Sequence, residues 1–144
     1  MKRILLFVTC LTLTYNWANA QINPAKIDII RDSFGVPHIF GKTDPDVAYG
    51  LAWAHAEDDF GTIQQSLMAG KSMLAQYQGK KGASIDYIIH LLRIPELVQA
   101  KYESDLSPAF KKLLEGYAAG LNAYANAHPK EVLLKKIFPV TPKD

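Results

Sequence analysis

Four side chains within five consecutive residues have the chemistry of a metal or acid–base site: His55, Glu57, Asp58 and Asp59. His55 and Asp58 are three residues apart, so on a helix they share one face and could both bind a cation. Two ligands do not make a metal site, however, and no second histidine follows four residues after the first. We therefore interpret the cluster as a partly exposed polar face of a helix and expect no metal site.

A second candidate is His38, which could act as a general base. No serine or cysteine is placed to be its nucleophile, because the serines at 33, 66, 84, 104 and 107 lie in turn, helix or cap contexts. A structural histidine, hydrogen-bonded within a sheet, is the better interpretation. His90 and His128 are expected at a helix face and a helix end. With no phosphate-binding loop or dinucleotide fingerprint, the sequence predicts no catalytic residue and no cofactor, and it identifies no substrate-binding residue.

The elements that must position these side chains begin with a β-hairpin at residues 27–40. Gly35 can adopt the positive φ of a tight turn at residues 33–35, and Pro37 has no N–H to donate to a neighbouring strand. Apolar residues lead into the turn and out of it: Ile27, Ile29, Val36, Ile39 and Phe40. We expect two short strands, the second of which needs no ladder bond at its proline.

The next long segment has the signals of a helix that runs from Asp44 to Met68 or Ala69. Asp44 is the expected N-cap, with Pro45 at the first helical position. Glycines at 50 and 61 each cost about 1 kcal/mol relative to alanine, so we expect either a close backbone neighbour or a bend. The expected apolar stripe contains Val47, Leu51, Ala54 and Asp58, and then Phe60, Ile63 and Leu67.

Further helices are predicted over 71–78, 85–92 and 95–103, with a turn at residues 80–82. Ser107 caps a last long helix that begins at Pro108 and ends at His128-Pro129. On it, Gly116 and Gly120 make a flat strip suited to close helix packing, and residues 137–144 form an extended tail. Its expected apolar face contains Phe110, Leu113, Leu114, Tyr117, Leu121 and Tyr124. One hairpin followed by four or five helices indicates the α+β class, with a small sheet that lacks partners.

Residues 1–20 have the pattern of a secretory signal peptide. Lys2 and Arg3 precede an apolar run, and residues 18–20 (Ala-Asn-Ala) form a small-x-small cleavage site between Ala20 and Gln21. The run is too short to cross a membrane, which needs about 20 residues. Cleavage would remove two basic residues, which leaves 16 − 2 = 14 basic against 14 acidic residues, and the only cysteine, Cys10. A neutral mature chain argues against nucleic acid or an anionic membrane as partner.

Five segments in this order resemble the penicillin acylase family of N-terminal-nucleophile amidohydrolases. They are residues 27–32 (IDIIRD), 35–39 (GVPHI) with 49–50 (YG), 54–58 (AHAED), 106–108 (LSP) and 115–124 (EGYAAGLNAY). Each segment alone is a weak signal, but their order is specific, and together they cover most of the chain after residue 20. The family usually has an arginine directly after the aspartate that matches Asp58, whereas this chain has Asp59, so we do not expect the internal ion pair that such an arginine would make.

The resemblance implies that residues 21–144 are the N-terminal part of an α-chain, a fragment of an αββα Ntn-hydrolase fold. In the family, a serine or another nucleophile begins a separate β-chain and uses its own α-amino group as base. The implied reaction hydrolyses the amide between an acyl group and an amine nucleus, as in β-lactam side chains or acyl-homoserine lactones. The expected partners are that β-chain and a small acyl-amide substrate, in a secreted or periplasmic location. The alternative is a secreted helical binding or remnant module without catalysis.

Overall fold

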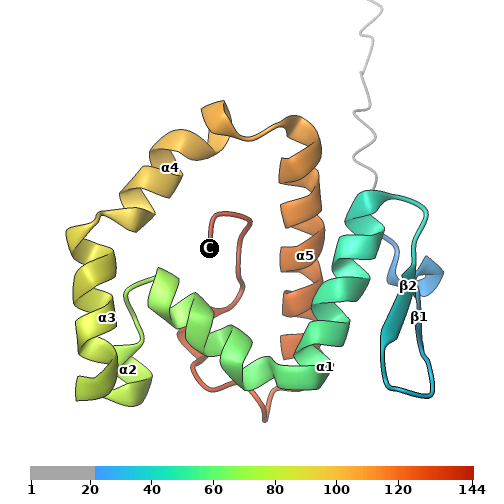
Figure 1. Cartoon of the computed structure of the whole chain (residues 1–144), viewed down its shortest axis with the longest axis horizontal. Coiled ribbons are helices and arrows are strands. Elements are labelled where there is room, and N and C mark those ends of the chain that lie inside the picture. The colour runs from blue at the N-terminus through green and yellow to red at the C-terminus, as the bar shows by residue number, and fades with distance from the viewer. Residues whose placement is uncertain (1–21) are drawn as a thin grey trace, which may run out of the picture.

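The computed structural model describes residues 22–144, which form a hairpin followed by five α-helices (Figure 1). The strands are β1 (Asp28–Arg31) and β2 (Pro37–Phe40). The helices are α1 (Asp44–Gly70), α2 (Ala75–Gln78), α3 (Lys80–Leu91), α4 (Ile94–Asp105) and α5 (Pro108–Ala127), with short 3-10 turns η1 (Pro24–Lys26) and η2 (Lys135–Ile137). The α+β class expected from the sequence is confirmed.

The hairpin has the predicted turn and an antiparallel register that pairs Ile29 with Ile39 and Arg31 with Pro37. Gly35 has a φ of 81°, and its N–H donates to the carbonyl oxygen of Asp32 over 3.0 Å. The inner face of the hairpin packs on α1 at Gly50. A Cβ atom at that glycine would lie only 2.6 Å from a methyl group of Ile39 and 3.0 Å from one of Ile27. Gly50 thus has close neighbours, but they are side chains of the hairpin and not the backbone that the sequence predicted.

Helix α1 begins one residue earlier than predicted, because Thr43 and not Asp44 is the N-cap. Thr43 and Asp46 form a capping box, in which each side chain accepts a hydrogen bond from the backbone N–H of the other residue. The helix is broken at Asp59, whose backbone is extended with a φ of −158°. The side chain of Asp59 accepts a hydrogen bond from the N–H of Thr62 over 3.0 Å and so caps the second half of α1.

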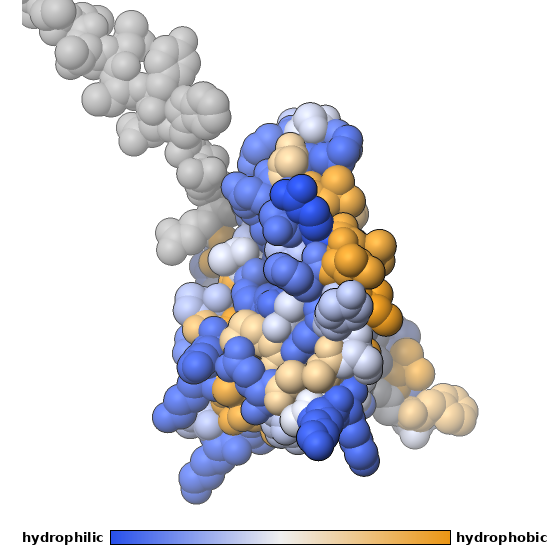
Figure 2. All heavy atoms as spheres, turned by 90° about the vertical axis from the view of Figure 1, so that its left-hand side faces the viewer, coloured by the Kyte–Doolittle hydropathy of each residue, from blue (hydrophilic) through white to orange (hydrophobic). Residues whose placement is uncertain are grey.

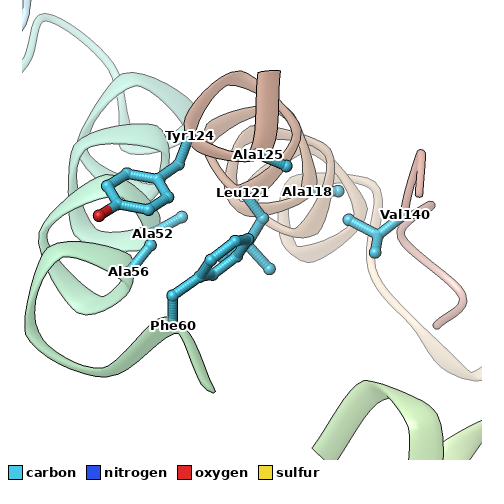
Figure 3. Close-up of a cluster of buried hydrophobic side chains, with 8 residues drawn as sticks. All are labelled: Ala52, Ala56, Phe60, Ala118, Leu121, Tyr124, Ala125 and Val140. Atoms are coloured by element: carbon cyan, nitrogen blue, oxygen red, sulfur yellow. The ribbon is translucent and has the colours of Figure 1, made fainter. Parts of the chain in front are cut away.

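The core lies between α1 and α5 and is built from small residues on the long helices. Gly116 packs directly against the backbone of Pro45, and Gly120 packs against the carbonyl group of Tyr49. The predicted small-residue strip on α5 is thus a site of close helix packing. Figure 3 shows the aliphatic and aromatic side chains that complete this core: Ala52, Ala56, Phe60, Ala118, Leu121, Tyr124, Ala125 and Val140.

The apolar stripe predicted for the first half of α1 is partly wrong. Ala54 is buried, but Val47 and Leu51 are each 36% exposed and Asp58 is exposed. The buried face instead follows Ala48, Ala52 and Ala56, because the glycines of α5 allow only small residues to approach so closely. On α5, the predicted Leu121 and Tyr124 are buried, whereas Phe110 is exposed.

The boundaries predicted for the middle of the chain also need correction. The helix expected over 71–78 forms only at Ala75–Gln78, since Ser72 has a φ of 54°. Residues 80–82 are the first turn of α3 and not a separate turn. Gly82 packs against the backbone of Leu74, and the carboxylate of Asp86 accepts the N–H groups of Leu74 and Ala75 at 2.8 Å each. These contacts fix α2 and α3 together.

The tail does not extend freely but returns through the arch formed by α1, α3, α4 and α5 (Figure 1). Two side-chain amides hold its backbone. Gln64 accepts from the N–H of Leu133 and donates to the carbonyl oxygen of Glu131, and Asn122 pairs in the same way with both backbone groups of Val140. Lys71 adds an ion pair with Asp144 at 2.6 Å. Ile137 and Val140 are buried as a result.

Candidate functional site

The polar cluster singled out in the sequence lies where the hairpin meets α1, and Arg31 is at its centre. The Nη2 atom of Arg31 lies 3.1 Å from Glu57 and 2.9 Å from Asp58, and it donates to the carbonyl oxygen of Ala54 over 3.3 Å. The Nη1 atom donates to the carbonyl oxygen of Gly35 over 2.8 Å. Hydrogen bonds to Glu57 and Asp58 raise the pKa of the guanidinium group. One arginine thus ties the turn of the hairpin to the middle of α1.

The junction is partly open to solvent, so its ion pairs contribute geometry more than stability. The side chains of Arg31, Glu57 and Asp58 are 31%, 41% and 55% exposed. Glu57 also accepts a hydrogen bond from the indole N–H of Trp53 over 2.9 Å. The polar helix face inferred from the sequence is therefore present on α1. Its carboxylates, Glu57 and Asp58, form ion pairs with Arg31 of β1.

His55 and Asp59 point to other partners, so the four-residue cluster does not gather into one site. The Nδ1 atom of His55 lies 3.2 Å from the hydroxyl oxygen of Tyr117 on α5. Asp59 caps the second half of α1, and hydrogen bonds from the hydroxyl and N–H groups of Thr62 lower the pKa of its carboxyl group. Among residues 22–144, no group of three or more His, Cys, Asp or Glu side chains could hold a metal ion.

His38 lies on the outer face of the hairpin and interacts with Asp32. The Nε2 atom of His38 is 3.4 Å from Asp32, whose other carboxylate oxygen accepts the N–H groups of Val36 and Phe34. These two backbone hydrogen bonds are the main reason that the pKa of Asp32 is lowered. His38 thus belongs to the structure of the turn.

Three serine hydroxyl groups form hydrogen bonds with nearby backbone. Ser66 donates to the carbonyl oxygen of Thr62, Ser104 donates to Lys101, and Ser107 caps α5. Ser72 was overlooked as a candidate, and its hydroxyl oxygen is buried without a hydrogen-bond partner in the described part of the chain. The histidines at 38, 55 and 128 pair with Asp32, Tyr117 and the carbonyl oxygen of Tyr124, so none of these contacts activates a serine.

A groove of about 800 Å³ lies between α4, the end of α1 and the tail. Its lining is mostly apolar and includes Met73, Val98 and Tyr102, with Lys71 and Asp144 at one side. Sequence reasoning missed Gln64 and Asn122, the two amides that bond to the backbone of Leu133 and Val140. Each of them is a single polar residue on an otherwise apolar helix face, and that is the sequence signal that could have pointed to them.

Within residues 22–144, no helix combines the length and the apolar character needed to cross a membrane. The candidate signal peptide and its cleavage site between Ala20 and Gln21 lie outside the described residues, as does Cys10.

Comparison with known proteins identifies the family of this chain. The model of the penicillin amidase family matches residues 26–143. The chain belongs to this family. Among curated members, the penicillin G acylase of Escherichia coli is 30% identical over 148 aligned positions, which cover 96% of this chain and 17% of the relative. The acyl-homoserine lactone acylase PvdQ of Pseudomonas fluorescens is 28% identical, with 73% of this chain and 14% of the relative covered.

A solved member of the penicillin amidase family has the same fold over most of the described residues. A thermostable penicillin G acylase from Alcaligenes faecalis superposes with a TM-score of 0.66 and 23% identity, covering 81% of this chain and 66% of that chain. The hairpin with its helices is therefore the architecture of a penicillin acylase segment. The chain spans about a sixth of the length of these curated relatives, so the activity of a whole acylase is a matter for proposal.

Proposed function

We propose that residues 21–144 are the N-terminal scaffold of a secreted amide hydrolase. The enzyme would remove an acyl group from an amine nucleus, of the β-lactam side-chain or the acyl-homoserine-lactone type. The observation that carries the proposal is the family match over residues 26–143, which includes every described element from the hairpin to the tail. Relatives of both substrate types match this chain, so the acyl and amine groups stay open.

In this proposal the nucleophile comes from a β-chain of the same precursor and not from residues 21–144. A chain cleaved after Ala20 would begin with Gln21, which has no hydroxyl or thiol group. An α-amino group titrates near 7.7–8.0 in model peptides, so a serine at the start of a β-chain would carry its own base at neutral pH. The bonding of Ser66, Ser104 and Ser107 to nearby backbone groups supports a scaffold role for this segment.

The scaffold would hold the hairpin and the groove in fixed positions relative to each other. Arg31 locks the hairpin to α1, and the glycines of α5 lock α1 to α5. Gln64, Asn122 and Lys71 hold the tail beside the groove. A β-chain that covers this segment would meet a preformed surface, which lowers the entropic cost of assembly.

An activity assay tests whether the nucleophile lies outside residues 21–144. Residues 21–144 alone, incubated with chromogenic phenylacetyl amides and long-chain acyl amides, should show no turnover. The DNA after the Asp144 codon should continue to a Gly-Ser or similar junction, and the longer product should hydrolyse one of these amides. Turnover by residues 21–144 that survives replacement of every serine would refute the mechanism. A stop codon directly after Asp144 would favour the non-catalytic module.

Secretion is tested separately by the mass of the processed chain. The charged start, the apolar run and the Ala-Asn-Ala order support a cut after Ala20. Intact-mass analysis of periplasmic material should give a chain that begins at Gln21. A chain that retains Met1 would sink the secretion proposal and leave the family assignment untouched.

A further inference from the structure

Helix α4 crosses the arch from α3 to α5 and has little core of its own (Figure 1). Of its 12 residues, only Tyr102 is buried. Among the helices of residues 22–144, α4 contacts mainly α3, which precedes it in the chain. Most of the stability of a helix in a protein comes from burial of an apolar face, and a helix of this length is marginal without it. The packing therefore stabilises α4 less than it stabilises α1 or α5.

A groove lies where the core beneath α4 would be. The inner side of α4 lines the groove of about 800 Å³ with Ile94, Val98 and Tyr102. The opposite walls come from the end of α1 and from the tail, and include Met73 and Pro142. An apolar side chain that borders open space makes fewer van der Waals contacts than one in a packed core. The groove thus weakens the attachment of α4.

The backbone departs from helical geometry at both ends of α4. Arg93, directly before α4, has a φ of 55°, which a residue with a side chain rarely adopts, and its side chain forms no cap hydrogen bond. Leu106, directly after α4, is extended with a ψ of 136°, and Ser107 then caps α5. Because the helical hydrogen bonds of α4 end at these two residues, α4 can unfold without unwinding α3 or α5.

A small cluster of side chains, here called the latch, fastens α4 to α5 and to the tail. The Nζ atoms of Lys111 and Lys143 lie 5.5 Å and 5.1 Å from the centre of the Tyr102 ring. Lys111 also donates to the carboxylate of Glu103 over 2.7 Å and to its carbonyl oxygen over 2.9 Å. Lys143 donates to the side chain of Gln99 over 3.2 Å. The side chain of Glu103 is 71% exposed, so salt screens its ion pair with Lys111.

We propose that α4 is a strap over the groove that unfolds locally, as one unit, while α1 and α5 stay folded. Opening begins and ends at Arg93 and Leu106, breaks the latch and exposes the apolar walls of the groove to solvent. Salt increases the open fraction because it weakens the latch. Proteins open in contiguous units that need less free energy than global unfolding, and a segment with few buried contacts opens first. This property belongs to the fold and does not depend on the proposed acylase activity.

Amide hydrogen exchange of the chain, followed by mass spectrometry, tests whether α4 opens separately. Amides of residues 94–105 should exchange at least about tenfold faster than those in the buried middle of α5, around Leu121. Their exchange rates should also respond less to low concentrations of urea, because local opening exposes less surface than global unfolding does. Exchange of the two segments at one rate, with one dependence on urea, would overturn the proposal.

Substitution of Lys111 tests the latch. Lys111→Gln removes the ion pair with Glu103 and should speed the exchange of residues 94–105 about two- to fivefold, without changing the middle of α5. Lys112→Gln makes the same change on the next residue, which is exposed, and should leave residues 94–105 at their native rate. About 1 M NaCl should move the native chain toward the rate of Lys111→Gln.

Brief digestion with trypsin gives a second measurement of the same opening. Cleavage after Lys101, within α4, should be faster in Lys111→Gln than in Lys112→Gln, and each variant loses one cleavage site in α5. Equal rates of exchange and of cleavage in the two variants would overturn the role of the latch. A rise in the exchange of α5 as large as that of α4 would show that Lys111→Gln destabilises the whole chain, and it would overturn the proposed strap.

Discussion

At the scale of single residues, the polar groups that matter most are those that bond to distant backbone. Gln64 is fully buried, yet each polar atom of its amide has a partner: its Nε2 donates to Phe60 and Glu131, and its Oε1 accepts from Leu133. The amide bonds to the N–H and C=O groups of the tail as the backbone of a neighbouring strand would. Ser107 instead caps α5, His38 contacts Asp32 at the turn of the hairpin, and His55 contacts Tyr117 on α5.

Replacement of Gln64 should destabilise the chain through the tail. Gln64→Met keeps the volume but leaves the N–H of Leu133 and the carbonyl group of Glu131 without their partner. A fully buried unsatisfied group costs about 1–3 kcal/mol, and these two bonds are part-buried, so we expect a loss of roughly 2–4 kcal/mol in the free energy of unfolding by urea. Gln76→Met, on an exposed residue, should change it by less than about 0.5 kcal/mol. Equal effects would show that the amide does not hold the tail.

The cap at Asp59 should make the break in α1 sensitive to acid. Its hydrogen bonds with Thr62 lower the pKa in the folded state, so its contribution to stability is present above the unfolded pKa, near 3.9. That contribution is lost as the pH falls through the lowered folded pKa. Asp59→Asn keeps an acceptor for the N–H of Thr62 but does not titrate. Thermal melts from neutral pH to about pH 3 should therefore show a smaller acid loss for Asp59→Asn than for the native chain.

At the scale of elements, the sequence predicted most of the fold, and its errors have local causes. The hairpin turn and both ends of α5 lie where Gly35, Ser107 and His128 indicated. The break at Asp59 was not predicted because no proline marks it in the sequence. The start of α3 was missed because Gly82, which marks a turn in sequence, here allows contact with the backbone of Leu74. The stripe on α1 was misjudged because alanine, and not valine or leucine, fits against the glycines of α5.

The close packing of α1 on α5 should tolerate no side chain at its centre. In Gly120→Ala, the new methyl group would collide with the carbonyl group of Tyr49 and lie 2.8 Å from the Cβ of Ala52. Overpacking of this kind costs about 1–3 kcal/mol, measured as a fall in the free energy of unfolding. Gly70→Ala is the matched control, since its Cβ would meet nothing within 4 Å. Comparable losses in the two variants would mean that the close contact with α1 does not determine the cost at Gly120.

At the scale of the whole molecule, apolar surface is distributed unevenly. Figure 2 looks onto the side that bears α3 and α4 and shows hydrophobic residues gathered along one flank. The exposed apolar side chains of these helices are Ile85, Tyr87, Ile88, Leu91, Leu92 and Leu97. Contiguous apolar surface of this extent marks an interaction site or an aggregation liability. In the proposed acylase, the β-chain would cover this apolar surface.

The isolated segment should therefore be marginally stable and associate through α3. Burying a large apolar side chain contributes about 1.5–3 kcal/mol, and Leu91 and Leu92, at 62% and 60% exposed, receive little of it here. Leu91→Lys should reduce light scattering on heating and change the free energy of unfolding by less than about 0.5 kcal/mol. Leu121→Ala, in the α1–α5 core, should cost about 2–5 kcal/mol. A native chain that stays monodisperse and melts in one sharp transition at high temperature would contradict the scaffold proposal, because its α3 face would then need no cover.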